Sequence, residues 1–294
     1  MSMNIKKILE KHVSERVSAH VGQRIQKSNP ILEETRKKNA LNDARNAQII
    51  KSKAITQITN IEELGEEIHV YYTVQMNDLV KHGERIYVEE CEETRKATIQ
   101  NAKVMSDILL SQVVDEEIPA ELQLSHDETR DVRFVYDRRA AVRYAEQWWN
   151  DYNPKYKKFE NDCTNFISQC LRAGGAPMTG YPNRSKGWWM QNNSWSYSWS
   201  VANSLRLYLS NSKSGLRTVE KRSASELIPG DVICYDFEGD GRYNHNTIVV
   251  AKDANGMPLV NAHTTNSRMR YWSYEDSTAY TPNIKYKFFH IVDS

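Results

Sequence analysis

Tryptophan is confined to one part of this chain of 294 residues. The seven tryptophans all lie beyond residue 135: Trp148, Trp149, Trp188, Trp189, Trp195, Trp199 and Trp272. Charge changes along the chain as well, because residues 1–57 carry a net charge of +7, residues 58–134 one of −11 and residues 135–294 one of +5. A chain whose composition changes in this way is expected to fold as two domains with different cores.

We place an N-terminal accessory domain at residues 1–130, a linker at 131–135 and a second domain at 136–294. Hydrophobic residues make up 39% of the chain, which is enough for packed cores. The overall net charge of +1 argues against a nucleic-acid partner held by bulk charge. No apolar run approaches the roughly 18 residues that span a membrane, and the N-terminus has no apolar segment of the secretory type. We therefore expect a cytoplasmic protein with no membrane or nucleic-acid partner, while association with a spore or cell wall stays open.

The N-terminal domain is predicted to contain long helices followed by strands. Apolar residues at three- and four-residue spacing predict helix over residues 4–57, broken at Asn29-Pro30, with a second helix over 31–54. Residues 66–75 and 84–90 are rich in β-branched and aromatic side chains, which predicts an antiparallel hairpin. Nothing in this region has catalytic spacing, so we interpret it as an α+β partner or oligomerisation module.

A cysteine at the start of a predicted helix is the first chemical signal in the second domain. The helix runs from Asp162, a favourable N-cap residue, to Gly174, a favourable stop, which places Cys163 in its first turn. There the helix dipole and the free N–H groups favour the thiolate, which is the nucleophile, and a backbone N–H can bind an oxyanion. The four cysteines show no metal-ligand spacing, so neither a metal nor another cofactor is predicted.

A cysteine nucleophile needs a base, which is normally histidine. His245 begins a predicted strand, and the turn Asn255-Gly256 joins that strand to its neighbour in a strong hairpin pattern. Asn261 and His263 are two residues apart on the neighbouring strand, so they share one of its faces. Either of them can orient the His245 ring in a nucleophile–base–orienter arrangement.

Five stretches of the second domain resemble, in order, a bacterial family labelled putative amidase domain, which belongs with papain-like, NlpC-type cysteine amidases and peptidases. The stretches are YDRRAAVRYAEQWW, NPKYKKFENDCTNFISQCLRAGG, SWSYSWSVANSLRLYL, ELIPGDVICYDFEGDGRYNHNTIVV and LVNAHTTNSRMRYW. The resemblance covers about residues 136–294 and does not extend to residues 1–130. It implies an α+β, papain-like fold in which the nucleophile helix packs on an antiparallel sheet.

The resemblance also implies roles for single residues. Cys163 matches the family's nucleophile and His245 its base, and the third catalytic group is either Asn261 or His263. Tyr156, shortly before the nucleophile, is implied to lie near the site. The implied function is hydrolysis of an amide bond through a cysteine acyl-enzyme, with a peptide or cell-wall-like amide of peptidoglycan type as the substrate.

Two further patterns have competing readings. Trp188, Trp195 and Trp199 can line a groove for a sugar or peptide chain, or they can fill the core of a loop-rich domain. Residues 236–241 repeat a carboxylate at every second position, like the start of a calcium loop, but the twelfth position is Thr247 rather than Glu, which favours a polar turn.

The alternative to an enzyme is a protein without catalytic activity. It would bind a glycan or peptide, or would assemble as a homo-oligomer through residues 1–57, and its cysteine site would be degenerate.

Overall fold

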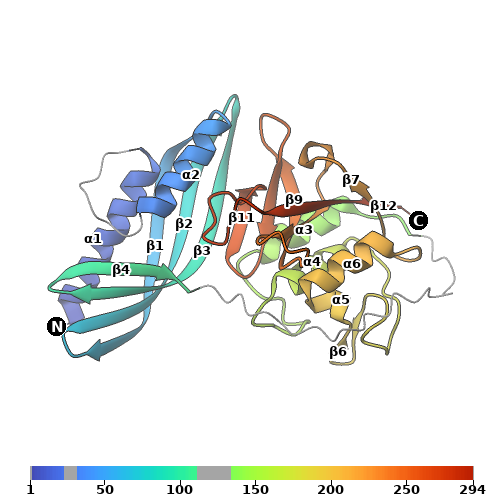
Figure 1. Cartoon of the computed structure of the whole chain (residues 1–294), viewed down its shortest axis with the longest axis horizontal. Helices are drawn as coiled ribbons and strands as arrows, with labels where there is room; N and C mark the ends of the chain where they lie inside the picture. The colour runs from blue at the N-terminus through green and yellow to red at the C-terminus, as the bar shows by residue number, and fades with distance from the viewer. Residues whose placement is uncertain (1, 23–31, 111–133, 294) are drawn as a thin grey trace. The chain divides into compact units, whose positions relative to one another are not determined.

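The computed structural model describes residues 2–22, 32–110 and 134–293 (Figure 1). These residues form two compact units. Unit 1 comprises Met1–Ser111, Thr265–Met269 and Ser273–Thr278, and unit 2 comprises Gln112–Thr264, Arg270–Trp272 and Ala279–Ser294. The linker expected at 131–135 lies mostly outside the described residues. Two short C-terminal segments, Thr265–Met269 and Ser273–Thr278, belong to unit 1. A single domain boundary along the sequence, as predicted, would assign both of them to the second domain.

Unit 1 begins with the helices α1 (Ser2–His20) and α2 (Leu32–Ala44). The helical spacing predicted for the start of the chain is confirmed in α1, where Ile5, Leu9 and Val13 are buried in the core of the unit. Because this apolar face packs against the unit's own sheet, it is used within the fold. No helix in the described parts of the chain combines the length and the apolar character needed to cross a membrane.

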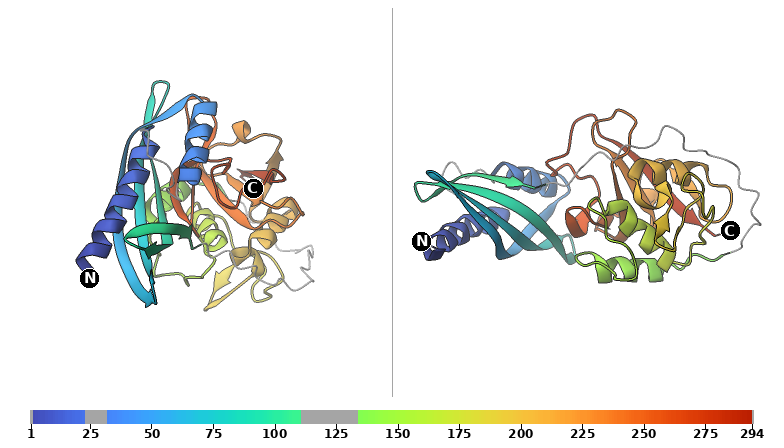
Figure 2. Two further views of the ribbon diagram at one scale, coloured as in Figure 1. Left: turned by 60° about the vertical axis from the view of Figure 1, so that its left-hand side comes forward. Right: turned by 90° about the horizontal axis from the view of Figure 1, so that it is seen from below.

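The sheet of unit 1 is an antiparallel meander with α1 and α2 against one face (Figures 1 and 2). Its strands are β1 (Ala47–Leu64), β2 (Glu67–His82), β3 (Arg85–Gln100) and β4 (Lys103–Leu109). The predicted hairpin is confirmed between β2 and β3. The helix predicted over 31–54 is wrong beyond Ala44, because Asn46 adopts a positive φ of 58° and the chain continues as strand. Ala47 and Ile49 then alternate with exposed neighbours, as the pleat of a strand requires.

The outer edge of β3 is covered by two different strands. β4 pairs with Arg95–Gln100, and β11 (Asn266–Tyr271) pairs with Glu90–Glu92 through its first three residues. The ion pair between Arg268 and Glu90, 2.6 Å long, adds to this second pairing. A segment from the far end of the sequence therefore completes the unit 1 sheet.

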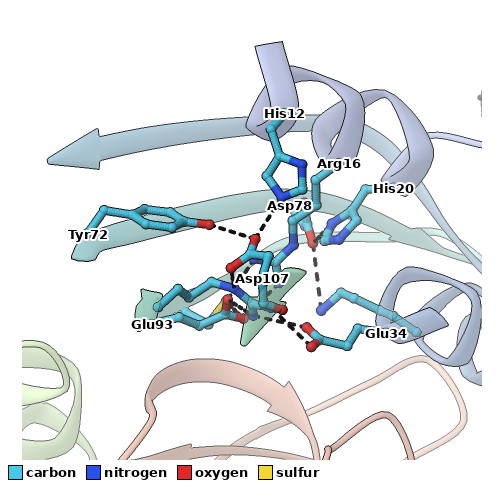
Figure 3. Close-up of polar contacts among 11 residues, drawn as sticks. His12, Arg16, His20, Glu34, Tyr72, Asp78, Glu93 and Asp107 are labelled. Atoms are coloured by element: carbon cyan, nitrogen blue, oxygen red, sulfur yellow. Dashed lines mark hydrogen bonds and ion pairs between the residues drawn. The ribbon is translucent and has the colours of Figure 1, made fainter. Parts of the chain in front are cut away.

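Hydrogen bonds between titratable side chains also hold α1 to its sheet (Figure 3). Three of these side chains recur every four residues along one face of α1, and each bonds a buried carboxylate of the sheet: His12 to Asp107 (2.7 Å), Arg16 to Glu93 (2.6 and 2.7 Å) and His20 to Asp78 (2.9 Å). Arg95 on β3 is fully buried and joins Asp107, Glu93 and Glu34 of α2 through its guanidinium group. Buried charges are tolerated only when they are paired and hydrogen-bonded, and these are.

Unit 2 contains helices on an antiparallel sheet of strand order β10-β9-β8-β12-β7. Its helices are α3 (Arg138–Trp148), α4 (Cys163–Ala173), α5 (Tyr197–Ser200) and α6 (Ala202–Asn211), with a 3-10 turn at Ala224–Glu226. Its strands are β5 (Met190–Gln191), β6 (Ser194–Trp195), β7 (Arg217–Lys221), β8 (Val232–Asp236), β9 (His245–Lys252), β10 (Pro258–Ala262) and β12 (Lys285–Val292).

The helix that carries Cys163 lies in the interior of unit 2. The side chains of α4 from Cys163 to Leu171 are all buried, and α4 packs against β9 and β10. The predicted hairpin at Asn255-Gly256 is confirmed, since Gly256 has a φ of 77° in the turn between β9 and β10. The predicted α+β arrangement, with a cysteine helix on an antiparallel sheet, is confirmed at this level.

Candidate active site

Cys163 is the first residue of α4, and only 6% of it is exposed. Burial raises the pKa of its thiol above the ordinary value, while the hydroxyl groups of Thr164 and Thr264 and the backbone N–H of Asn246 act in the opposite direction. Thr164 Oγ1 lies 3.7 Å from the sulfur. The expected preference for the thiolate at the helix start is therefore outweighed by desolvation.

Asn246 ties β9 to the start of α4. The side-chain Nδ2 of Asn246 donates a hydrogen bond of 3.0 Å to Thr164 Oγ1, and Asn246 is fully buried. The Asn246 side chain therefore points toward the face of the sheet that α4 covers. Its backbone N–H favours the ionised form of Cys163 and so lowers the pKa of the thiol.

His245 precedes Asn246 on β9 and points the other way. Successive side chains of a strand face opposite sides of the sheet, so the ring lies on the face away from α4. It is placed there beside the rings of Tyr235 and Phe237, with centroid separations of 5.6 and 6.2 Å. Burial, together with the positive charge of Arg270, lowers the pKa of His245 to about 3, so the ring is neutral at neutral pH. The surroundings described for this ring are Tyr235, Phe237 and the charge of Arg270, and the pairing of His245 with Cys163 as base and nucleophile stays a prediction.

His263 lies on the same side of the sheet as α4. Its Nδ1 is 2.8 Å from Asp162 Oδ2, and its Nε2 donates to the backbone oxygen of Trp148 at 2.7 Å. The ring stacks on Phe166 of α4 with a centroid separation of 4.0 Å. With both ring nitrogens occupied, His263 joins the end of α3 to the residue that precedes Cys163.

Asp162 acts as a polar hub at the start of α4. Its Oδ1 accepts hydrogen bonds from the Phe159 backbone N–H (3.0 Å) and from Asn165 Nδ2 (2.8 Å). It occupies the N-cap position, but its side chain makes no capping hydrogen bond to the helix. Its bonds instead fix the loop before Cys163 and the ring of His263.

Asn261 points toward α3. Its Nδ2 donates to Glu146 Oε1 at 2.8 Å and to the Ala145 backbone oxygen at 3.3 Å. These two bonds anchor β10 to α3. The structure therefore gives Asn261 a contact with α3.

Trp188 and Trp199 belong to the core. Both have no exposed surface, so neither can contact a ligand in this structure, and the groove expected from them is corrected on that point. Their indole N–H groups are used internally, since Trp188 donates to Ser168 Oγ (3.0 Å) and Trp199 to Asn165 Oδ1 (2.8 Å). The tryptophan-rich stretch thus packs on the helix that carries Cys163.

Trp195 and Tyr156 retain partial exposure. The Trp195 ring lies 4.4 Å from Lys157 Nζ and 5.3 Å from the Arg184 guanidinium carbon, which are cation–π distances. The Tyr156 ring stacks on Trp199 at a centroid separation of 5.9 Å. Of the four aromatic residues predicted to bind substrate, these two remain accessible.

The acidic loop after β8 is a turn in which carboxylates of the loop bind its own backbone N–H groups. Asp236 accepts hydrogen bonds from the backbone N–H groups of Gly239 (2.7 Å) and Gly241 (2.8 Å). Asp240 accepts one from the Arg242 N–H. The polar-turn reading is thus the one that these contacts support. Within the described ranges, no group of His, Cys, Asp and Glu side chains is arranged to hold a metal ion.

Sequence reasoning missed Thr164, Asn246 and Thr264, the residues that act on the Cys163 sulfur. Thr264 has a φ of 87°, an outlier for a β-branched residue that costs on the order of 1–3 kcal/mol. The sequence signal for Thr264 is its position directly after His263, one of the two residues predicted to orient the base. A positive φ at a threonine cannot be read from residue type.

Comparison with known proteins covers both units. Over 307 aligned residues the chain is 48% identical to "Uncharacterized protein YhbB" of Bacillus subtilis (strain 168), which spans 99% of this chain and 97% of that protein. It is 34% identical over 142 residues to "Uncharacterized protein YjcM" of the same organism, which spans 45% of this chain and 31% of that protein. No solved structure matches the chain.

The family model described as "Putative amidase domain" matches residues 135–289. This range includes Cys163, His245 and His263. The family description indicates hydrolysis of an amide bond at a coarse level. Because the match covers more than half of the chain, this protein belongs to the "Putative amidase domain" family.

Proposed function

We propose that this protein hydrolyses an amide bond with Cys163 as its nucleophile. The observation that carries the proposal is the place of Cys163 at the first position of a buried helix, with Thr164 Oγ1 3.7 Å from its sulfur. The Asn246 backbone N–H and the hydroxyl groups of Thr164 and Thr264 all favour the ionised form of Cys163. Burial raises the pKa values of Cys163, Cys170 and Cys234 alike, and Cys163 is the one of these three on which several hydrogen-bond donors act in the opposite direction.

The reaction follows from thiol chemistry. The Cys163 sulfur attacks the carbonyl carbon of the amide, and the C=O electron pair moves onto the oxygen. When that intermediate collapses, the C–N bond breaks, and the proton lost by the thiol ends on the departing amine. Water then attacks the thioester, which leaves a carboxylic acid and returns a proton to the sulfur. The N–H groups of the first turn of α4 are suited to binding the oxyanion.

The histidine of this site is His263 in our proposal, and its role is to position the nucleophile. It lies on the face that α4 covers, and Asp162 connects it to Cys163 along the chain. His245 lies on the other face, beside Tyr235. The proposed substrate is an amide in a peptide of peptidoglycan type, which is supported by the family resemblance.

The test uses the full chain and soluble muropeptides from a Gram-positive cell wall, with new amines and acids followed by mass spectrometry. Cys163→Ala is expected to lower the rate by roughly a thousandfold or more. Cys170→Ala, seven residues along the same helix, is the matched control and should keep activity. Activity retained in Cys163→Ala would contradict the mechanism. Intact muropeptides with the wild-type chain would contradict the wall substrate.

The same assay compares the two histidines. We expect His263→Ala to slow both hydrolysis and iodoacetamide alkylation of Cys163, because the loop before the nucleophile loses its anchor. His245→Ala is expected to keep both rates within about twofold. A loss that follows His245 instead would restore the pairing that the sequence predicts.

A further inference from the structure

The loop that precedes α4 brings a lysine against a partly exposed aromatic ring. Lys157 Nζ lies 4.4 Å from the centroid of the Trp195 ring. The Phe159 ring meets the same indole in a T-shaped arrangement, with a centroid separation of 4.9 Å. Lys157 is exposed, but the contact with Trp195 restricts the positions that its long side chain can take. Less conformational entropy is therefore lost when its ammonium group binds a ligand.

Arg184 reaches the same ring from another part of the chain. Its guanidinium carbon lies 5.3 Å from the Trp195 ring centroid and 4.9 Å from that of Tyr197. Its Nε donates a hydrogen bond of 3.0 Å to the Trp195 backbone oxygen, and its own backbone oxygen accepts one of 2.8 Å from the Tyr197 N–H. One of the five guanidinium N–H groups thus fixes the position of the group, and the other four have no acceptor among the described residues.

The two cations also lack an acidic partner. In the parts of the chain that the structure describes, neither Lys157 nor Arg184 forms an ion pair with a carboxylate, and both side chains are exposed. Two positive charges over one ring repel each other, so an anion bound beside them is favoured. The terminal N–H groups of arginine match the two oxygens of a carboxylate, and lysine adds a point charge.

The loop that carries Lys157 is fastened to the start of α4. The Lys157 backbone oxygen accepts a hydrogen bond of 3.0 Å from Asn165 Nδ2. The Phe159 backbone N–H donates one of 3.0 Å to Asp162 Oδ1. These bonds fix the loop relative to the helix that begins at Cys163. A ligand bound by the two cations is therefore held at a set position with respect to the nucleophile.

We propose that Lys157 and Arg184 bind a carboxylate of the substrate, so that this protein acts on amides in acidic peptides. The inference rests on the proposed function, because it names the class of substrate for the same site. It also changes the role of Trp195. With two cations over its ring, Trp195 positions the groups that bind the ligand and does not itself stack on a sugar.

Binding is tested apart from turnover, in the full chain with Cys163→Ala. The probes are a dansyl-labelled peptide of three glutamates, amidated at its C-terminus, and the same peptide built of three glutamines. Fluorescence anisotropy is expected to show that the glutamate peptide binds about tenfold more tightly at low ionic strength, and that added salt reduces the difference. Equal affinity for the two peptides, or binding of neither, would overturn the inference.

Lys157→Met and Arg184→Met each remove one charge and keep an unbranched side chain against Trp195. Each is expected to weaken binding of the glutamate peptide by about tenfold and to change that of the glutamine peptide by less than about twofold. Arg184→Lys keeps the charge without the paired N–H groups and should have an intermediate affinity. Lys213→Met removes an exposed lysine beyond α6 and is the matched control, with no change expected. Equal losses for both peptides would indicate a structural role and contradict the inference.

Hydrolysis separates this inference from the proposed function. With Cys163 intact, muropeptides with free carboxylates are compared with the same muropeptides after amidation of those groups. Lys157→Met and Arg184→Met are expected to raise KM for the acidic form by about tenfold and to leave kcat within about twofold. Selective binding of the glutamate peptide without any hydrolysis would support the carboxylate site and contradict the proposed function. Hydrolysis of both muropeptide forms with the same KM would contradict the inference alone.

Discussion

His245 shows how a single residue can occupy its predicted place on a strand while its side chain faces away from α4, the helix that carries Cys163. Its place at the first position of a hairpin strand was predicted, and β9 does begin at this residue. The side of the sheet that it faces is set by Asn246, whose amide bonds Thr164 on α4. A shift of one position along the strand decides whether residue 245 or residue 246 faces the helix of Cys163, and residue types alone do not reveal that choice.

The buried His245 ring makes the stability of unit 2 depend on pH. Its pKa is lowered to about 3, so below the ordinary value of 6.5 the unfolded chain binds a proton that the folded chain does not. This contribution is absent at pH 7.5 and destabilises the fold by about 1.4 kcal/mol at pH 5.5. We expect His245→Asn to remove this pH dependence in urea unfolding followed by tryptophan fluorescence. An equal loss of stability in wild type and variant between these pH values would contradict it.

At the scale of elements, the sequence predicts α1 and the hairpin strands but not the long strand β1. Helical spacing is strong where Ile5, Leu9 and Val13 recur, and these residues are buried. Over Ala47–Leu64 Ile and Thr, which prefer strands, follow a stretch of charged helix formers, so the helical pattern extends past Ala44 on the sequence while the chain itself turns into strand. The buried ionic contacts of α1 could not be predicted, because each pairs residues that are 58 to 95 positions apart.

These contacts predict that α1 is sensitive to the loss of one charge. Arg16→Met leaves Glu93 buried beside Arg95 with half of its partners gone. We expect the free energy of unfolding of unit 1 to fall by about 3–5 kcal/mol, measured by urea unfolding with circular dichroism. Lys6→Met is the control on the same helix, since Lys6 forms only an exposed pair with Glu10 and should cost less than about 1 kcal/mol. Equal effects of the two variants would show that the buried pair adds nothing.

At the scale of the whole molecule, the two units should respond differently to acid. The pKa values of Asp78, Glu93 and Asp107 lie below their ordinary values, because cationic partners in unit 1 outweigh the burial of each carboxylate. Carboxylates of this kind stabilise the fold above about pH 4.5 and lose that contribution as the pH falls further. Unit 1 is therefore expected to unfold progressively below pH 4.

The position of the tryptophans makes this measurable. All seven lie in residues of unit 2, so tryptophan fluorescence follows that unit, whereas circular dichroism follows both. Between pH 7 and 4.5 the transition of unit 2, seen by fluorescence, should move, and below pH 4 the part of the circular dichroism signal that comes from unit 1 should be lost as well. Circular dichroism that stays unchanged down to pH 2 would contradict the role of these carboxylates.

The pairing of β11 with β3 restricts where this gene can be divided into fragments that fold. Glu90–Glu92 pair with Asn266–Arg268. These partners lie inside the family match, toward its C-terminal end at residue 289. A coding fragment that stops in the linker would leave the N–H and C=O groups along part of β3 unpaired, and another extended chain could then pair with them. A fragment that starts at the linker would carry β11 without β3, the strand that pairs with Asn266–Arg268. Recombination that replaces the N-terminal region with another module therefore also leaves Asn266–Arg268 without a partner strand, unless the codons for these residues change too.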